Sequence, residues 1–210
     1  MEIEIYADVV CPWCYIGKRR LEQALESYDG DVTIRYRPFQ LDPSPVTDPK
    51  PLVDALAAKF GGRERAEQMF AQVTEVAAGV GLKLDFDRAV SANTFEAHRL
   101  VRFAEERGRA GETVEALYRA YFTDGVDVGS RDALVKIAAE VGLDEAETRE
   151  YLESNLGRRE VAADLSTAHQ LGVTSVPTFV LAGKYGVTGA QEPETLLAAL
   201  REVEHRESAA

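Results

Sequence analysis

Alternating apolar residues open the chain and predict a β-strand that leads directly into a helix. Every second position is apolar in Ile3, Ile5, Ala7 and Val9, which is the period of a strand with one buried face. Between residues 21 and 28 the apolar positions take helical spacing instead, and Gly30 follows as a stop signal. Residues 32–39 alternate again and predict a second strand. This order indicates a βαβ unit with two parallel strands.

A long helical tract follows this unit. Residues 40–51 contain four prolines and predict an extended connection without a helix. Amphipathic spacing then predicts helices over residues 52–60, 63–80, 92–107, 112–122, 131–141 and 158–171. We expect Ser91 to cap the third of these helices. Asp144 and Glu147 have the spacing of a capping box and predict one more helix before the last.

The pattern returns to strands after Gly172. Apolar runs at residues 178–182 and 185–188 predict a β-hairpin, with its turn at Gly183-Lys184. Residues 192–206 predict a final amphipathic helix.

The predicted strands come from the two ends of the chain. The 210 residues are enough for one large domain or for a domain with an insertion. We therefore predict a discontinuous α/β domain built from residues 1–45 and 168–210. Residues 46–167 form an all-helical insertion domain in this prediction. Apolar residues make up 45% of the chain and charged residues 29%, which is typical of a globular protein in water.

Charge and hydropathy exclude several function classes. The chain has 24 Lys and Arg against 36 Asp and Glu, and a net charge of −12 argues against binding to nucleic acid or to an anionic membrane surface. The sequence shows neither a basic-then-apolar leader nor an apolar run of about 18 residues. We therefore expect a cytoplasmic protein that binds no nucleic acid and no membrane. The sequence does not specify its oligomeric state.

Two cysteines supply the candidate chemistry, and the chain contains no others. In Cys11-Pro12-Trp13-Cys14 they stand where the first strand turns into the first helix, so that Pro12 suits the first helical position and Cys11 the N-cap. A sulfur there faces unpaired backbone N–H groups and the positive end of the helix dipole, and both favour the thiolate. Cys14, one turn further along, can close a ring with Cys11 and resolve a mixed disulfide.

Two structural interpretations of this motif are less favoured. A Cys-x-x-Cys can supply half of a zinc site, but zinc needs four ligands, and the remaining candidates, His98, His169 and His205, are scattered without paired spacing. We therefore expect no metal. A purely structural disulfide across two residues would constrain the unfolded chain very little. A redox-active dithiol is the favoured interpretation.

Several dispersed motifs carry a family resemblance. Cys11-Pro12-Trp13-Cys14 together with Ser175-Val176-Pro177-Thr178-Phe179 resembles the thioredoxin superfamily, and the large helical insertion resembles the DsbA class. The finer match is to the FrnE-like branch, which is related to 2-hydroxychromene-2-carboxylate isomerase and kappa-class glutathione transferase. That match rests on Asp8 to Gly17, Phe39-Gln40-Leu41-Asp42-Pro43, Asn93-Thr94 with Ala97-His98-Arg99, and Gly189-Ala190-Gln191. These landmarks span essentially the whole chain.

The resemblance implies a thioredoxin-like α/β fold with a large all-helical insertion and assigns roles around the dithiol. Pro177 is then the cis-proline that faces Cys11 and Cys14, and these three residues are the catalytic group. The backbone of Val176 would pair with an incoming peptide or thiol. On the residues alone, an ordinary trans proline that starts an edge strand remains the alternative for Pro177.

Further candidates have a functional and a structural interpretation. Pro12 and Trp13 lie between the cysteines, and with Phe39 they are candidates for substrate contact at an apolar rim, although core packing is the alternative for Phe39. Asn93 and His98 are candidates to line a substrate pocket, although His98 can equally be a packed helix residue. Asp8, three residues before Cys11, is a candidate proton acceptor or simply ends the strand.

The predicted function is that of a thiol-disulfide oxidoreductase or isomerase acting through Cys11 and Cys14. No cofactor is expected beyond this redox-active dithiol, with glutathione as an alternative co-substrate. The expected partners are protein or small-molecule thiols and disulfides and a recycling partner that the sequence does not identify. Two alternatives stay open: a glutathione-dependent isomerase or transferase, in whose families a serine matches Cys11, and a non-catalytic polypeptide-binding or chaperone module.

Overall fold

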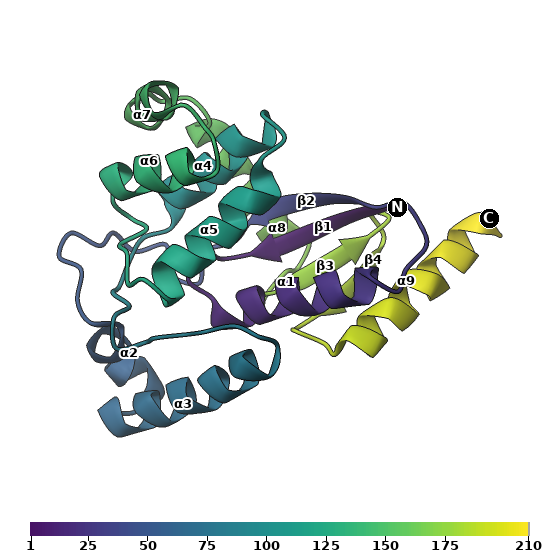
Figure 1. The fold of residues 1–210 in the computed structure, drawn as a ribbon, viewed down its shortest axis with the longest axis horizontal. Coiled ribbons are helices and arrows are strands. Elements are labelled where there is room, and N and C mark those ends of the chain that lie inside the picture. The colour runs from purple at the N-terminus through teal and green to yellow at the C-terminus, as the bar shows by residue number, and fades with distance from the viewer. Residues whose placement is uncertain (210) are drawn as a thin grey trace.

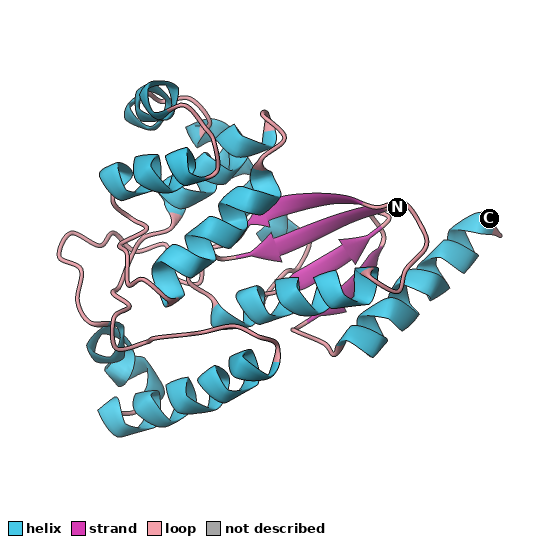
Figure 2. Ribbon diagram, in the orientation of Figure 1, coloured by secondary structure: helices cyan, strands magenta, loops and turns pink. Residues whose placement is uncertain are grey.

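A four-stranded mixed sheet lies at the centre of the computed structural model, which describes residues 1–209 (Figures 1 and 2). The strands are β1 (Glu2–Ala7), β2 (Thr33–Pro38), β3 (Thr178–Leu181) and β4 (Tyr185–Thr188), in the order β2-β1-β3-β4. β1 runs parallel to β2, with Ile3 opposite Ile34. It runs antiparallel to β3, with Ile5 opposite Phe179, and β3 and β4 form the predicted hairpin. The sheet therefore joins the two ends of the chain, as the sequence predicts.

The hairpin turn lies one residue earlier than predicted. Ala182 and Gly183 both have positive φ angles, 50° and 67°, and the Lys184 N–H donates to the Leu181 carbonyl over 3.1 Å. Two successive positive φ angles match the twist of a β-hairpin, but the first of them falls on an alanine. An alanine carries no sequence signal for that conformation, which is why the pattern placed the turn at residues 183–184.

Helices cover both faces of the sheet. α1 (Pro12–Leu25) and α9 (Pro193–Ser208) pack together on one face, while α8 (Arg158–Gln170) packs against β2 behind the sheet (Figure 1). The remaining helices lie between β2 and α8 in the sequence. They are α2 (Leu52–Phe60), α3 (Arg63–Gly79), α4 (Phe95–Glu105), α5 (Ala110–Phe122), α6 (Arg131–Glu140) and α7 (Glu145–Glu153).

The predicted start of α4 was wrong by three residues. The helix begins at Phe95, and Ser91 does not cap it, because the Ser91 hydroxyl accepts a backbone N–H from the proline-rich segment instead. The Asn93 side chain also binds the proline-rich segment. Its side-chain oxygen accepts the Phe95 N–H, and its amide donates to the carbonyls of Pro43 and Ser44, each over 3.0 Å. Residues 91–93 therefore anchor a loop and do not extend the helix.

One apolar cluster connects the sheet to the helical block. It includes Ile3 and Ile5 on β1 and continues through Leu117, Leu134 and Leu152 on α5, α6 and α7. A second, smaller cluster, made of Tyr6, Phe39, Ala168 and Val173, fills the space between the other face of the sheet and the end of α8. Among the described residues, no helix combines the length and the apolar character needed to cross a membrane. The division into two domains stays a prediction.

Candidate active site

The backbone between β1 and α1 places the two cysteines. The Cys11 N–H donates to the Asp8 carbonyl over 3.0 Å, which turns the chain sharply after β1. Cys11 itself is extended, with φ −94° and ψ 113°, and occupies the N-cap position, and Pro12 follows as the first helical residue. The Cys14 N–H then donates to the Cys11 carbonyl over 3.0 Å. This is the strand-to-helix turn that the sequence predicts.

Both cysteines are free thiols and both are buried, with exposed fractions of 4% for Cys11 and 1% for Cys14. Burial raises the pKa of the Cys14 thiol well above its ordinary value, and the hydrogen bond and the charge of Cys11 raise it further. Cys14 therefore holds its proton strongly. The two sulfurs are thus unequal: Cys14 needs a base before it can attack, and Cys11 lies at the helix terminus.

The loop before β3 supplies the second half of the site. The peptide bond between Val176 and Pro177 is cis. The Cys11 thiol donates to the Val176 carbonyl, with 3.8 Å between the sulfur and the oxygen. Gly17 on α1 lies against the same loop, because a Cβ atom at this position would be only 2.7 Å from Pro177 Cγ. The structure therefore brings Cys11, Cys14, Val176 and Pro177 together.

Asp8 lies behind the dithiol and is only 1% exposed. One carboxylate oxygen, Oδ2, accepts the Leu41 N–H over 2.8 Å. The other, Oδ1, has no hydrogen-bond partner among the described residues. His98 Nε2 lies 3.5 Å from this oxygen and 3.0 Å from the Phe39 carbonyl. Because a carbonyl can only accept, Nε2 carries a hydrogen in this arrangement.

The other predicted site residues divide between surface and interior. Trp13 is 43% exposed beside the cysteines, as expected for a residue at the rim. Phe39 is a correction, because its side chain is buried in the second apolar cluster and packs against the His169 ring. Asn93 anchors the proline-rich segment, and a contact of Pro12, Trp13 or Asn93 with substrate stays a prediction. Among residues 1–209, no three His, Cys, Asp or Glu side chains gather as metal ligands would.

Tyr118 lies near the dithiol, and no sequence pattern singled it out. It is 1% exposed, and its pKa is raised by burial and then by the negative charges that Cys14 and Cys11 would carry. Its ring stacks on Tyr15 with 4.8 Å between centroids, and the Tyr15 hydroxyl donates to Glu115 over 2.8 Å. The regular apolar spacing of residues 114–122 indicated only a core helix. Its proximity to the dithiol depends on how α5 packs on α1.

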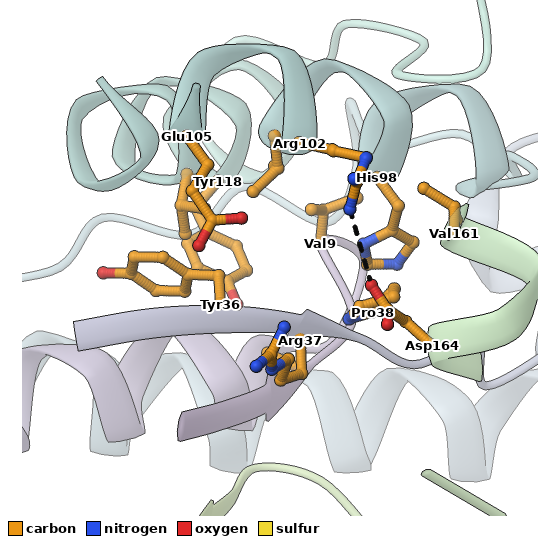
Figure 3. Close-up of a pocket in the computed structure, with 13 residues that line it drawn as sticks. Val9, Tyr36, Arg37, Pro38, His98, Arg102, Glu105, Tyr118, Val161 and Asp164 are labelled. Atoms are coloured by element: carbon orange, nitrogen blue, oxygen red, sulfur yellow. Dashed lines mark ion pairs between the residues drawn. The ribbon is translucent and has the colours of Figure 1, made fainter. Parts of the chain in front are cut away.

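A small cavity of about 20 Å³ lies between the ends of β1 and β2 and the helices α4, α5 and α8 (Figure 3). Val9, Tyr118 and the His98 ring line it. Arg102 and Asp164 form an ion pair of 4.0 Å beside that ring, and both are about one third exposed (Figure 3). The cavity therefore reaches from the interior toward a charged part of the surface.

Comparisons with known proteins identify the family of the chain. A family model described as the DSBA-like thioredoxin domain matches residues 2–201. The chain is 29% identical over 184 residues to the uncharacterized protein YwbO of Bacillus subtilis, covering 86% of each chain. It is 26% identical over 180 residues to 2-hydroxychromene-2-carboxylate isomerase of Sphingobium xenophagum, covering 83% of this chain and 86% of that protein.

Among solved structures, a probable DsbA oxidoreductase from Streptomyces coelicolor superimposes with a TM-score of 0.90 at 39% identity. The match covers 96% of this chain and 89% of that one. The sheet and the helical block therefore have the same arrangement in both proteins. The chain belongs to the DsbA-like thioredoxin domain family.

Proposed function

We propose that the protein is a thiol-disulfide oxidoreductase that works by exchange through Cys11 and Cys14. The observation that carries this proposal is the placement of Cys11. Its sulfur lies at a helix N-terminus and 3.8 Å from the Val176 carbonyl, with Cys14 buried one turn behind it. A helix N-terminus stabilises a thiolate, and the thiolate is the nucleophile in exchange.

In the reducing direction the Cys11 thiolate attacks one sulfur of a substrate disulfide. The substrate S–S bond breaks, a mixed disulfide forms at Cys11, and the departing substrate thiolate takes a proton from water. The Cys14 thiol then loses its proton and attacks Cys11 Sγ, which releases the second substrate thiolate and leaves the Cys11–Cys14 disulfide. In the oxidising direction the same steps run in reverse. The Val176 carbonyl, no longer held by the Cys11 thiol, becomes free to accept an N–H from the substrate.

Asp8 is the proton acceptor for Cys14 in this proposal. The raised pKa of Cys14 means that its proton does not leave unaided. The Asp8 carboxylate lies behind the dithiol, and its Oδ1 atom has no hydrogen-bond partner within the described chain. A buried carboxylate with a free lone pair is a competent base, and such groups typically accelerate a proton-transfer step by about 10²–10⁴-fold.

A redox titration tests the proposal. The protein is equilibrated with glutathione and dithiothreitol buffers of stepped potential while Trp13 fluorescence is followed, because the chain has one tryptophan and it lies between the cysteines. We expect one reversible two-electron transition, lost in Cys11→Ser and in Cys14→Ser. A potential close to about −120 mV would identify an oxidant, and one close to about −270 mV a reductase. A fluorescence signal that never responds to the buffer would overturn the proposal.

A glutathione-dependent isomerase is the second candidate, because a curated relative at 26% identity is 2-hydroxychromene-2-carboxylate isomerase. The Cys11→Ser variant separates the two functions. An exchange enzyme loses all insulin reduction with this variant. An isomerase would convert 2-hydroxychromene-2-carboxylate in the presence of glutathione, and its Cys11→Ser variant would keep that activity. A variant that lost exchange but still suppressed aggregation of an unfolded protein would favour the chaperone interpretation instead.

A further inference from the structure

If Asp8 accepts a proton from Cys14 in every turnover, it needs a path by which protons exchange with solvent. Its side chain is 1% exposed, and one of its oxygens is occupied by the Leu41 N–H. The side-chain nitrogen that faces the other oxygen is His98 Nε2, at 3.5 Å. Any proton that reaches or leaves Asp8 Oδ1 by this side must therefore pass His98.

The hydrogen bond of His98 determines which of its nitrogens is available. Nε2–H donates to the Phe39 carbonyl over 3.0 Å, so a neutral ring has its lone pair on Nδ1. The ring also lines the cavity of about 20 Å³ that Figure 3 shows. That volume is enough for about one water molecule, which polar lining groups can hold. His98 therefore connects a carboxylate on one side with a water-sized space on the other.

The cavity leads toward the surface at the Arg102–Asp164 ion pair, which we call the Arg102–Asp164 mouth. The Arg102–Asp164 ion pair lies beside the His98 ring, and the two side chains are 32% and 33% exposed (Figure 3). Asp8 faces His98 from the turn after β1. On the cavity side, the titratable and charged groups are Tyr36, Arg37, Arg102, Glu105, Tyr118 and Asp164. The two carboxylates and two guanidinium groups in this set give it a net charge of zero.

The sheet order separates this mouth from the substrate side. β2 lies on one side of β1 and β3 on the other. The cavity is lined by residues of β2, whereas the Cys11 sulfur meets Val176 in the loop that leads into β3. A bound substrate that covers Cys11 would therefore leave the Arg102–Asp164 mouth open to water.

We propose that His98 is a proton relay between Asp8 and the Arg102–Asp164 mouth, an assignment that rests on the proposed exchange function. The oxidised enzyme starts with Asp8 ionised and the His98 hydrogen on Nε2. When its disulfide is reduced, Cys14 leaves as a thiolate, cavity water gives a proton to His98 Nδ1, the Nε2 proton passes to Asp8 Oδ1, and Asp8 passes it on to Cys14. Asp8 is then ionised again, and His98 carries its hydrogen on Nδ1. Oxidation of the dithiol starts from this Nδ1–H tautomer: Cys14 gives its proton to Asp8, Asp8 passes it to Nε2, and Nδ1 releases its hydrogen to water. Protons and substrate thus use different sides of β1.

The test is single-turnover reduction and oxidation of the protein, followed by Trp13 fluorescence between pH 5 and 9. In His98→Ala we expect the proton-coupled step to slow by about tenfold or more, since general acid–base groups contribute at least this much. We expect added imidazole to restore the rate, because the deleted ring leaves a space of its own shape next to the cavity. His98→Gln keeps an N–H for the Phe39 carbonyl but cannot relay a proton, so it should be slow and gain nothing from imidazole.

Controls separate failure of the relay from failure of the function. His169→Ala removes a histidine that packs on Phe39 outside the cavity and should leave the rates unchanged. Asp8→Asn should be slow with or without imidazole. If wild-type protein shows no exchange, the proposed function fails. If wild-type protein is active and His98→Ala keeps its rate, or slows without any response to imidazole while its melting temperature falls, the relay is overturned and His98 is structural.

Discussion

Gly17 determines how closely α1 approaches the proline that faces the dithiol. A Cβ atom there would lie 2.7 Å from Pro177 Cγ and 3.4 Å from the Phe179 ring. The first of these distances is too short for two carbon atoms, so helix and loop would have to move apart. Because Cys11 is on that helix and Val176 precedes that proline, the movement would lengthen the contact between sulfur and carbonyl.

We expect Gly17→Ala to lower the free energy of unfolding by roughly 1–3 kcal/mol, the usual cost of overpacking, and to slow exchange. Urea denaturation and the insulin assay measure the two effects. Gly111→Ala is the matched control, because a Cβ atom at Gly111 on α5 meets nothing within 4 Å in the described chain. That variant should be neutral or slightly stabilised, since alanine is the better helix former. If the two variants had the same stability and the same rate of insulin reduction, the close approach of α1 to Pro177 would be contradicted.

The two cysteines should differ sharply in their reaction with oxidised glutathione. In Cys14→Ser, Cys11 stays at the helix N-terminus, which stabilises a thiolate, and its mixed disulfide cannot be resolved, so the adduct should accumulate at pH 7. In Cys11→Ser, the remaining thiol has a raised pKa, so it should stay unmodified. Intact-protein mass spectrometry measures both. Adducts of equal yield in the two variants would show that the raised pKa of Cys14 does not distinguish the thiols.

The sequence was sufficient to predict site features that depend on neighbouring residues in the chain. The position of Cys11 at an N-cap follows from the order of a strand, a cysteine and a proline, and the structure contains that turn. The pairing of Asp8 with His98 did not follow, because it joins residues 90 positions apart. The two interpretations of Phe39 stayed open for a related reason: only the packing of α8 on the sheet decides that its ring is interior.

At the scale of elements, a buried arginine holds α7 to α4. Arg99 is 0% exposed and donates to the carbonyls at the end of α7 and in the loop after it, namely those of Tyr151, Leu152, Ser154 and Leu156. Glu96 balances its charge over 2.5 Å. The last carbonyls of a helix have no hydrogen-bond donor within that helix, and this guanidinium donates hydrogen bonds to them.

Arg99→Met should therefore destabilise the protein by roughly 3–5 kcal/mol, the range for breaking a buried charge network. The substitution fills a similar volume but leaves the α7 carbonyls without their donor, while Glu96 keeps its ion pairs with Arg158 and Arg131. Arg149→Met makes the same change on the exposed surface and should alter stability little. Chemical denaturation of both variants at pH 7 gives the comparison. A small effect at position 99 would mean that water replaces the guanidinium.

Element boundaries were predictable where one residue decides them. Asp144 accepts the Glu147 N–H over 2.9 Å, as the capping-box spacing predicts, and α2 ends at Gly61 in the left-handed conformation. The start of α4 was not predictable in this way, because Ser91 and Asn93 have the composition of caps but bind a distant loop. A cap-type residue such as Ser or Asn has a side chain that can form a hydrogen bond with the backbone. The sequence does not specify which backbone segment that side chain will bind.

For the molecule as a whole, buried tyrosines couple stability to alkaline pH. Tyr15, Tyr118 and Tyr121 are each at most 5% exposed, and burial is the main cause that raises the pKa of all three. Their folded pKa values lie above the unfolded value of about 10, so the folded state keeps these protons longer. Stability from this source is complete below pH 10 and is lost as the pH rises further.

We expect the urea midpoint of the oxidised protein to stay nearly constant from pH 8 to about 10 and to fall steadily above that value. The oxidised form is used because it removes the titration of Cys14. Tyr118→Phe deletes one of the three hydroxyl groups and should make the decline shallower. A midpoint that did not change up to pH 11.5 would mean that the phenols ionise equally in both states.

A ribosome completes Cys11 and Cys14 long before it reaches Val176, which lies 165 residues after Cys11. Until β3 has emerged, β1 also lacks its antiparallel neighbour. At translation rates of about 5–20 residues per second, the nascent chain therefore carries an unfinished dithiol for roughly 8–33 seconds. During that interval the thiols have neither the Val176 carbonyl nor Pro177 beside them. The newborn protein consequently completes its dithiol site only after β3 has left the ribosome.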